Sequence, residues 1–336
     1  MDPVTRKLRR GALLRALYPP DGVKYLLSKG SPNFGRSIGS YSVGVVNMSA
    51  SVIRYLANGI RSPGNGFDIE HTFFWSLARH SAPWFHENDQ SASQFLKLYA
   101  GLNGFPMRRV KDLLLAQARS TLFRGFVVWS NWAKNGFIED GFDPDLINVI
   151  PPPVPVKETK EKDTGEGYNI LFVGRDFRRK GGDAALLIFS RIKKTIPQAR
   201  LLYVGPIEGL TLPQGVIHFE NPDDATLFYK IYPSADIFLM PTRVDAFGIS
   251  LVEAMSFGIP PVTSNVGSIP EYVNDGYNGY VHEKDDIDSM VESVLTLLQS
   301  GKQRRSLGGR AKDTVRDKFS PEVVGGKIRR LYDAAV

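Results

Sequence analysis

The sequence predicts an α/β protein built from two doubly wound parallel sheets. From about residue 168 onward, short apolar runs alternate with segments of helical periodicity, which is the pattern of parallel strands joined by helices. The chain has 336 residues, more than one hydrophobic core usually serves. A proline-rich and then charged stretch over 147–167 separates the two halves. We therefore predict an N-terminal domain over 1–150 and a C-terminal domain over 151–318.

The second half has the clearer pattern. Its apolar runs predict strands at 168–174, 199–205, 216–219, 235–241 and 259–265. Its periodic segments predict helices at 182–194, 225–232, 249–258, 285–299, 302–318 and 321–335. Ligands of such a sheet bind at the carboxyl ends of the strands. We expect the C-terminal segment, 319–336, to be a helix that crosses back to the N-terminal domain.

The first half belongs to the same fold class, although its pattern is less regular. Residues 22–30 predict a strand, 31–44 a loop rich in glycine and serine, and 45–59 a helix. The run FRGFVVWSN, at 123–131, predicts a strand with a polar tip, followed by a short helix that ends near residue 139. Both halves are thus predicted to be strand–helix domains.

The net charge of +7 resides in the N-terminal half. Residues 1–150 contain 18 Lys and Arg against 11 Asp and Glu, and the charges of the other residues cancel. An anionic membrane, an anionic substrate, nucleic acid or ordinary solvated side chains are all compatible with this excess. Basic segments with apolar residues at 6–18 and 105–125 are typical either of membrane-surface helices or of helices that cover a core. No nucleic-acid recognition motif accompanies them.

The chain has no cysteine, which excludes disulfides and cysteine-based zinc sites. No apolar run approaches the roughly 20 residues that span a bilayer. The basic N-terminal segment lacks the apolar stretch of a signal peptide. We expect a cytoplasmic protein, and contact with the inner face of a membrane is an open alternative.

The first motif with chemical content is VGRDFRRKGG, at 173–182. It follows a predicted strand and opens a predicted helix. Gly174 allows a tight exit from the strand, and Arg175 and Lys180 can turn toward one anion where helix N–H groups already favour negative charge. This pattern favours a diphosphate site, and a solvated basic loop is the alternative.

The second motif is DAFGISLVEAMSFG, at 245–258. Asp245 and Gly248 follow the strand at 235–241 and therefore lie in the ligand zone of the sheet. Glu253 is flanked by apolar residues on the following helix, where an exposed carboxylate is not expected. Residues 263–283 form a third strand end with a Gly-Ser loop and the run VGSIPE.

Together the motifs G-R-x4-K-G, D-x-F-G-x4-E, V-G-S-I-P-E and N-G-Y-V resemble the donor half of glycosyltransferase family 4, the retaining GT-B enzymes also called glycosyl transferases group 1. The resemblance covers about residues 120–280. It implies the GT-B fold, in which two Rossmann-like domains face a cleft. It also implies transfer of a hexose from a nucleotide-diphosphate sugar (UDP-, GDP- or ADP-linked) to a hydroxyl acceptor, either a glycan or a lipid-linked molecule. No metal or further cofactor is expected.

The resemblance also implies roles for individual residues. Asp245, Arg175, Lys180 and His86, which follows the apolar run at 84–85, would take part in catalysis, with His71 as the competitor for the histidine role. The donor would be held by Gly39, Ser40, Gly174, Arg175, Lys180, Asp245, Phe247, Gly248, Ile249 and Glu253. In this set Arg175 and Lys180 would bind the diphosphate, Asp245 the sugar hydroxyls and Glu253 the ribose. The family usually has Glu at the position of Asp245, which leaves the identity or pose of the sugar open.

Other interpretations remain. Two carboxylates are typical of glycosidases, although a diphosphate site would then be unexplained. Two D-x-D sequences, at 143–145 and 286–288, match metal-dependent transferases, but Asp at the start of a helix is an ordinary N-cap. A sugar-nucleotide-binding subunit with weak catalysis, or a sugar-nucleotide epimerase, has a similar architecture.

Overall fold

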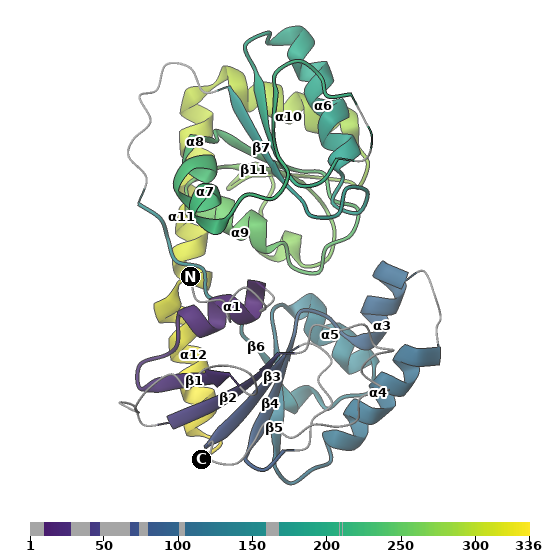
Figure 1. Ribbon diagram of the computed structural model, residues 1–336, viewed down its shortest axis with the longest axis vertical. Coiled ribbons are helices and arrows are strands. Elements are labelled where there is room, and N and C mark those ends of the chain that lie inside the picture. Colours follow the sequence, from purple (N-terminus) through teal and green to yellow (C-terminus); the bar gives the residue numbers. More distant parts are fainter. Residues whose placement is uncertain are drawn as a thin grey trace. The chain divides into compact units, whose positions relative to one another are not determined.

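The computed structural model describes residues 10–27, 41–47, 68–73, 80–100, 105–158, 168–207, 209 and 211–336. The chain forms two compact units (Figure 1). Unit 1 comprises Met1–Pro153 and Phe319–Val336, and unit 2 comprises Val154–Lys318.

Unit 1 is a parallel six-stranded sheet with helices on both faces. The strands lie in chain order, β1 (Val23–Leu27), β2 (Tyr41–Asn47), β3 (Ile69–Phe73), β4 (Trp84–Asn88), β5 (Phe123–Val128) and β6 (Ile147–Val149). The regular helices are α1 (Arg10–Leu17), α3 (Ala92–Phe95), α4 (Phe105–Gln117), α5 (Asn131–Glu139) and α12 (Pro321–Asp333). In the described sheet of unit 1, the strands thus lie side by side in the same order as they occur in the chain.

The strands of unit 1 contribute side chains to two separate hydrophobic cores, one on each face of the sheet. In β5, Phe126 and Val128 pack with residues of α4 and α5, whereas Val127 packs on the opposite face with Ile328 of α12. Successive side chains of a strand point to opposite faces, and β4 shows the same division, with Trp84 in one core and Phe85 in the other. The C-terminal helix is thus an integral layer of unit 1.

Two predictions for the first half were wrong. Residues 41–47, predicted as the end of a loop and the start of a helix, form β2, which pairs with β1 and β3. The run YSVGVVN contains three valines, and pairing with a strand on each side outweighs the loop propensity of its serine and glycine. The second error concerns β6, which begins the segment predicted as an interdomain connector and pairs with β5.

Unit 2 has the doubly wound order that the sequence predicts. Its parallel sheet runs β12 (Tyr280–His282), β11 (Pro261–Ser264), β10 (Ile237–Met240), β7 (Asn169–Val173), β8 (Arg200–Val204) and β9 (Val216–Phe219). The chain winds outward from β7 to β9 and then returns to β10 on the other side of β7. The order therefore reverses between β7 and β10, which pair through Ile237 with Ile170 and Phe238 with Leu171.

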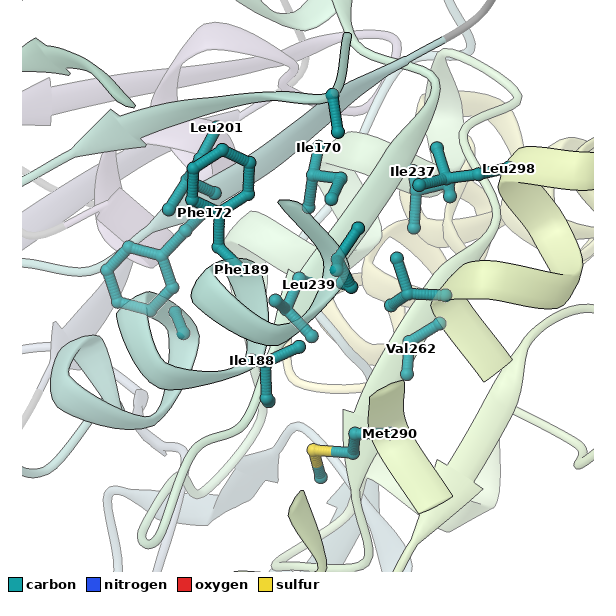
Figure 2. Close-up of a cluster of buried hydrophobic side chains, with 14 of the residues drawn as sticks. Ile170, Phe172, Ile188, Phe189, Leu201, Ile237, Leu239, Val262, Met290 and Leu298 are labelled. Atoms are coloured by element: carbon teal, nitrogen blue, oxygen red, sulfur yellow. The ribbon is translucent and has the colours of Figure 1, made fainter. Parts of the chain in front are cut away.

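The helices of unit 2 cover this sheet much as predicted. They are α6 (Gly182–Thr195), α9 (Ile249–Ser256), α10 (Ile287–Gln299) and α11 (Gly301–Phe319), together with a short irregular stretch that contains α7 (Asp224–Thr226), a π-helical turn and α8 (Tyr232–Ser234). Figure 2 shows how Phe189 of α6 and Met290 of α10 pack with the strand residues Phe172, Leu239 and Val262. This buried layer supports the strands whose carboxyl ends carry the motifs.

Candidate functional site

Two motif loops of unit 2 lie side by side at the reversal of strand order. One loop, 174–181, follows β7, and the other, 241–248, follows β10. Because β7 and β10 are neighbours, their carboxyl ends deliver both loops to the same edge of the sheet. Such a switch point is where open α/β sheets bind ligands.

The central contact of this site is an ion pair between residues 65 positions apart. The Lys180 ammonium donates a hydrogen bond to Oδ2 of Asp245. The other carboxylate oxygen, Oδ1, accepts the N–H of Gly248 at 3.1 Å and that of Phe247 at 3.4 Å. Asp245 is therefore held between a lysine and the backbone at the start of α9.

Asp245 carries a charge at neutral pH although it is nearly buried. Burial acts to raise the pKa of its carboxyl group, but the charge and hydrogen bond of Lys180, with the charge of Arg179, outweigh burial and bring the pKa below its usual value. The neighbouring hydroxyl of Tyr272 donates to the carbonyl of Phe247, and burial followed by the charge of Asp245 raises the pKa of Tyr272 well above its usual value. Tyr272 thus remains a neutral donor that holds the loop.

Glycine permits the close approach of the two loops. Gly181 has a φ of 75°, and a Cβ there would lie 1.9 Å from the carbonyl oxygen of Pro241. Gly248, the N-cap of α9, has a φ of 76°. Both values lie in the left-handed region, which side chains with a Cβ rarely adopt. Gly174 is buried, and its carbonyl oxygen lies where a Cβ on Gly205 would fall, at 1.8 Å.

The second acidic residue of the motif, Glu253, lies within α9 and is 4% exposed. The Tyr232 hydroxyl donates to its Oε2 at 3.1 Å. The structure thus gives the two motif carboxylates separate partners. Ile249 is the first residue of α9, where the leading N–H groups of a helix have no intrahelical acceptor.

The structure does not bring Arg175 to Lys180. The Arg175 side chain is exposed and makes no hydrogen bond to the described residues, whereas Lys180 is partly buried on Asp245. Spacing within the loop predicted that both would face one anion, but backbone bonds of this loop, such as Lys180 N–H to the Asp176 carbonyl at 3.0 Å, direct only Lys180 inward.

His86, the histidine singled out for catalysis, lies in the middle of β4 in unit 1 and is fully buried. Its Nδ1 lies 3.0 Å from Oγ1 of Thr72, directly opposite on β3. Since the Thr72 hydroxyl donates to the Phe85 carbonyl at 3.1 Å, it can only accept from His86, so Nδ1 carries the proton. Burial, followed by the nearby His71, lowers the pKa of His86 to about 3.

With its proton on Nδ1, the neutral His86 ring presents Nε2 as an acceptor. Within the described residues Nε2 has no hydrogen-bond partner. Gly39 and Ser40, the glycine-loop candidates, lie outside the described residues.

Sequence reasoning missed a buried polar network in unit 1. Glu87 is fully buried and accepts hydrogen bonds from Arg15 Nη2 of α1 at 2.9 Å and from Trp129 Nε1 at 2.7 Å, and His71 Nε2 lies 3.0 Å from its Oε2. His71 also hydrogen-bonds the Tyr332 hydroxyl of α12 through Nδ1. The competitor histidine therefore links β3, β4 and α12, and we assign it to this structural network.

The charge state of the network follows from burial and pairing. Burial favours the neutral form and lowers the pKa of His71, although Glu87 opposes this. For Glu87, burial acts to raise the pKa, but Arg15 and His71 together bring it below its usual value. Arg15, which the sequence presents as a break in an apolar run, is thus the buried counter-ion of Glu87.

The two D-x-D sequences begin helices, as predicted. Asp143 accepts the N–H of Asp145 at 3.0 Å, and Asp286 caps α10 by accepting the N–H of Ser289 at 3.1 Å. Across the described ranges, no three His, Asp or Glu side chains converge as a metal site would require. Ser130, in the polar tip predicted after the strand at 123–131, is the buried N-cap of α5.

The basic segments also have structural roles. In α1, Leu13 and Leu14 are buried in unit 1 together with Arg15. In α4, Leu114 is buried and Leu113 is 40% exposed. None of the helices in the described part of the chain combines the length and the hydropathy that a bilayer crossing requires.

Solved structures share the architecture of this chain. HepE of Anabaena in complex with UDP superimposes with a TM-score of 0.69 at 13% identity over 93% of this chain and 99% of that one. Sucrose-phosphate synthase from Thermosynechococcus elongatus gives a TM-score of 0.66 at 17% identity, with 88% of both chains covered. The fold is thus that of the GT-B glycosyltransferases, with two Rossmann-like domains.

Sequence comparison identifies the family. Residues 156–314, nearly all of unit 2, match the model of the family "Glycosyl transferases group 1" and belong to that family.

The chain is 24% identical to the capsular polysaccharide biosynthesis glycosyltransferase CapM of Staphylococcus aureus over 189 residues, 53% of this chain and 49% of CapM. It is 25% identical to D-inositol 3-phosphate glycosyltransferase of Acidothermus cellulolyticus over 319 residues, 82% of this chain and 69% of that protein. In most of these matches the aligned part spans about half the length of the curated relative. The resemblance seen in the motifs is confirmed at the level of the family.

Proposed function

We propose that the protein is a retaining, metal-independent hexosyltransferase that moves a sugar from a nucleotide-diphosphate sugar to a hydroxyl of a glycan or lipid-linked acceptor. The observation that carries the proposal is the meeting of Lys180, Asp245 and the first turn of α9 at the switch point of unit 2. This edge offers a cation for phosphate oxygens and a charged carboxylate for hydroxyl groups within one loop pair.

The lysine–aspartate pair is compatible with a bound diphosphate. An ammonium group has three N–H donors, so Lys180 can keep its bond to Asp245 and still donate to phosphate oxygens. Negative charge builds on the leaving diphosphate as the bond to the sugar breaks, and a cation fixed at that point stabilises the transition state. Arg175 is exposed in the same loop, and we propose that its side chain turns toward the diphosphate when the donor binds.

Asp245 and Glu253 would each bind a different part of the donor. Asp245, ionised and anchored on the Gly248 amide, would accept bonds from sugar hydroxyls, while Glu253 would accept them from the ribose. Neither is proposed as a nucleophile, since each is already held by protein donors. The leaving phosphate would assist deprotonation of the acceptor on the same face of the sugar.

His86 would contribute as a neutral acceptor. Its low pKa excludes a charged imidazolium at neutral pH, and the tautomer set by Thr72 leaves Nε2 to accept a hydroxyl proton. We therefore propose that His86 acts on a hydroxyl of the sugar or acceptor and not on the diphosphate.

Contact with an anionic membrane surface remains part of the proposal. Because Leu13 and Leu14 of α1 are buried in unit 1, the contact would rest on the exposed Leu17 of α1, the exposed Leu113 of α4 and neighbouring basic residues. Binding to vesicles of anionic lipid at moderate salt tests it, and an absence of binding contradicts it.

The function is tested by incubating the protein with UDP-glucose, UDP-N-acetylglucosamine, GDP-mannose and ADP-glucose in the presence of EDTA, and following sugar release or transfer. We expect turnover of at least one donor with the anomeric configuration retained. In the same assay, Glu253→Ala should weaken nucleotide binding, and His86→Ala should leave binding intact but slow transfer. Tight nucleotide binding without turnover would favour a binding subunit, and inversion of the anomeric centre would exclude the retaining mechanism.

A further inference from the structure

The ionic contacts of Arg243 extend across three loops of unit 2, beside the Lys180–Asp245 pair. We propose that Arg243 is a positioning residue for the donor site, acting through the loops that carry Lys180 and Asp245. The inference rests on the proposed function for its catalytic consequence, but its structural part stands on the contacts alone. Nothing in the family motifs described above includes this arginine.

Two of the three loops contribute acceptors to the Arg243 side chain. From the loop after β7 and the start of α6, Arg243 Nη1 bonds the Arg178 carbonyl at 2.8 Å and Oδ1 of Asp183 at 2.7 Å. From the loop after β12, its Nε bonds Oδ1 of Asp285 at 2.8 Å. The third loop, after β10, is that of Arg243 itself, two residues before Asp245.

Backbone contacts continue this connection toward the site. Arg243 N–H donates to the Arg179 carbonyl at 2.9 Å, and the Thr242 hydroxyl donates to the same carbonyl at 3.2 Å. In return, Arg179 Nη1 donates to the Val244 carbonyl at 3.0 Å. The residues that precede Lys180 and Asp245 in each loop are thus joined in both directions.

The backbone of the loop after β12 is adapted to this contact. Within the described residues, Asp285 is the only non-glycine residue with a positive φ, 66°. Aspartate tolerates this conformation better than most residues, but it still has a cost. The conformation places the Asp285 carboxylate on Arg243.

These ion pairs are poorly suited to a purely stabilising role. The side chains of Arg243, Asp183 and Asp285 are 31%, 25% and 47% exposed. Ion pairs this exposed add little to global stability because solvent screens them. Their geometric effect is not screened in this way, since a planar guanidinium bonded to two carboxylates and one carbonyl oxygen restricts where the loops can lie.

The variant that tests the inference is Arg243→Gln, with Arg191→Gln as its matched control. Arg191 pairs with Asp288 between α6 and α10 of the same unit, so the control also removes an exposed Arg–Asp pair but leaves the three loops untouched. Arg243→Lys is the conservative variant, because one ammonium keeps the charge but cannot reproduce the planar fork.

The first measurement is hydrogen exchange by mass spectrometry on the ligand-free protein. We expect faster exchange in peptides covering 175–182 and 241–248 for Arg243→Gln, and wild-type exchange there for Arg191→Gln. The second measurement is the affinity for UDP, GDP and ADP and the donor KM for the sugar nucleotide that the wild type turns over. For Arg243→Gln we expect both constants to rise roughly tenfold, with kcat and the thermal unfolding midpoint close to those of the control, and Arg243→Lys should recover part of the loss.

The two hypotheses fail differently. Unchanged exchange in both loops for Arg243→Gln overturns the positioning role, whatever the ligand. Faster exchange with an unchanged donor KM confines Arg243 to loop structure and also overturns the proposal. A wild-type protein that binds none of the nucleotides contradicts the proposed function, and the exchange data then still decide whether Arg243 holds the loops.

Discussion

At the scale of residues, the structure explains how a nearly buried carboxylate is tolerated at position 245. One oxygen of Asp245 accepts the Gly248 N–H three residues ahead, and the other accepts the Lys180 ammonium. Aspartate side chains commonly bond to backbone groups a few residues ahead, and a glutamate is one methylene longer. The departure from the glutamate usual in the family therefore coincides with a local hydrogen bond that suits the shorter side chain.

Replacing Lys180 with methionine tests the electrostatic role of this pair. Lys180→Met keeps much of the side-chain volume but removes the cation, so we expect donor turnover to fall by ~10²–10³. Removal of the positive charge also removes what lowers the pKa of Asp245 against the effect of burial. The measurement is kcat/KM for the donor that the wild type uses.

The matched control for that substitution is Lys194→Met. Lys194 is an exposed residue in the last turn of α6, so its loss should leave turnover unchanged. Equal turnover by wild type and Lys180→Met would contradict a role for Lys180 in stabilising the leaving group.

At the scale of elements, the site depends on how closely the loops after β7 and β10 approach. Gly181 permits this approach, since its φ is positive and a Cβ would collide with the Pro241 carbonyl. Gly267 has the same function one strand further on, where a Cβ would lie 2.0 Å from the Asp245 carbonyl oxygen. Small residues at these points allow three loops to converge on one edge.

The Gly181→Ala variant should therefore be destabilised. A left-handed conformation costs a residue with a Cβ about 1–3 kcal/mol, and displacement of Pro241 adds to this cost. Gly309→Ala is the control, because Gly309 is exposed within α11 with open space around its Cβ position, and alanine there should stabilise the helix by about 0.5–1 kcal/mol. Urea unfolding of both variants measures the difference, and equal midpoints would contradict the strain argument.

Elements of the second half were predictable because their signals are local. The apolar runs and helical periodicity after residue 168 correspond to β7–β11 and α6–α11. By contrast, β2 was missed because its serine and glycine residues are typical of loops, and only its two neighbouring strands make it a strand. The partner strands lie elsewhere in the chain, so the local pattern does not contain this information.

At the scale of the whole molecule, unit 1 is held together by a buried polar network as well as by its apolar cores. Arg15, Glu87, His71 and Tyr332 come from α1, β4, β3 and α12, which are widely separated in sequence. Breaking a buried pair by removing one partner is costly, because the remaining charge is left without compensation. The network therefore ties both ends of the described chain to the sheet of unit 1.

Unit 1 should lose stability as the pH falls. Burial lowers the pKa of both His71 and His86, so below about pH 6.5 the unfolded chain takes up protons that the folded unit does not bind. The free energy of unfolding then decreases by up to about 1.4 kcal/mol per pH unit for each histidine. For His86 the loss continues down to about pH 3, and protonation of Glu87 adds to it below the usual pKa of glutamate.

Urea unfolding at a series of pH values, with hydrogen exchange in β3 and β4 as the local probe, measures this effect. The free energy of unfolding should change less steeply with pH in His86→Gln than in the wild type, whatever the absolute stability of the variant. Identical slopes would show that His86 does not remain neutral in the folded protein.

The sequence by itself determined the fold class, β7–β11 and the main helices of unit 2, and the motif residues, because periodicity and loop composition are local properties. Tertiary structure decided which of those residues meet. Lys180 reaches Asp245 only because the strand order reverses between β7 and β10, whereas Arg175, in the same motif, remains in solvent. It also decided that His71 and Arg15 serve a buried network, since their partner Glu87 is 16 and 72 residues away and only the folded sheet brings them together.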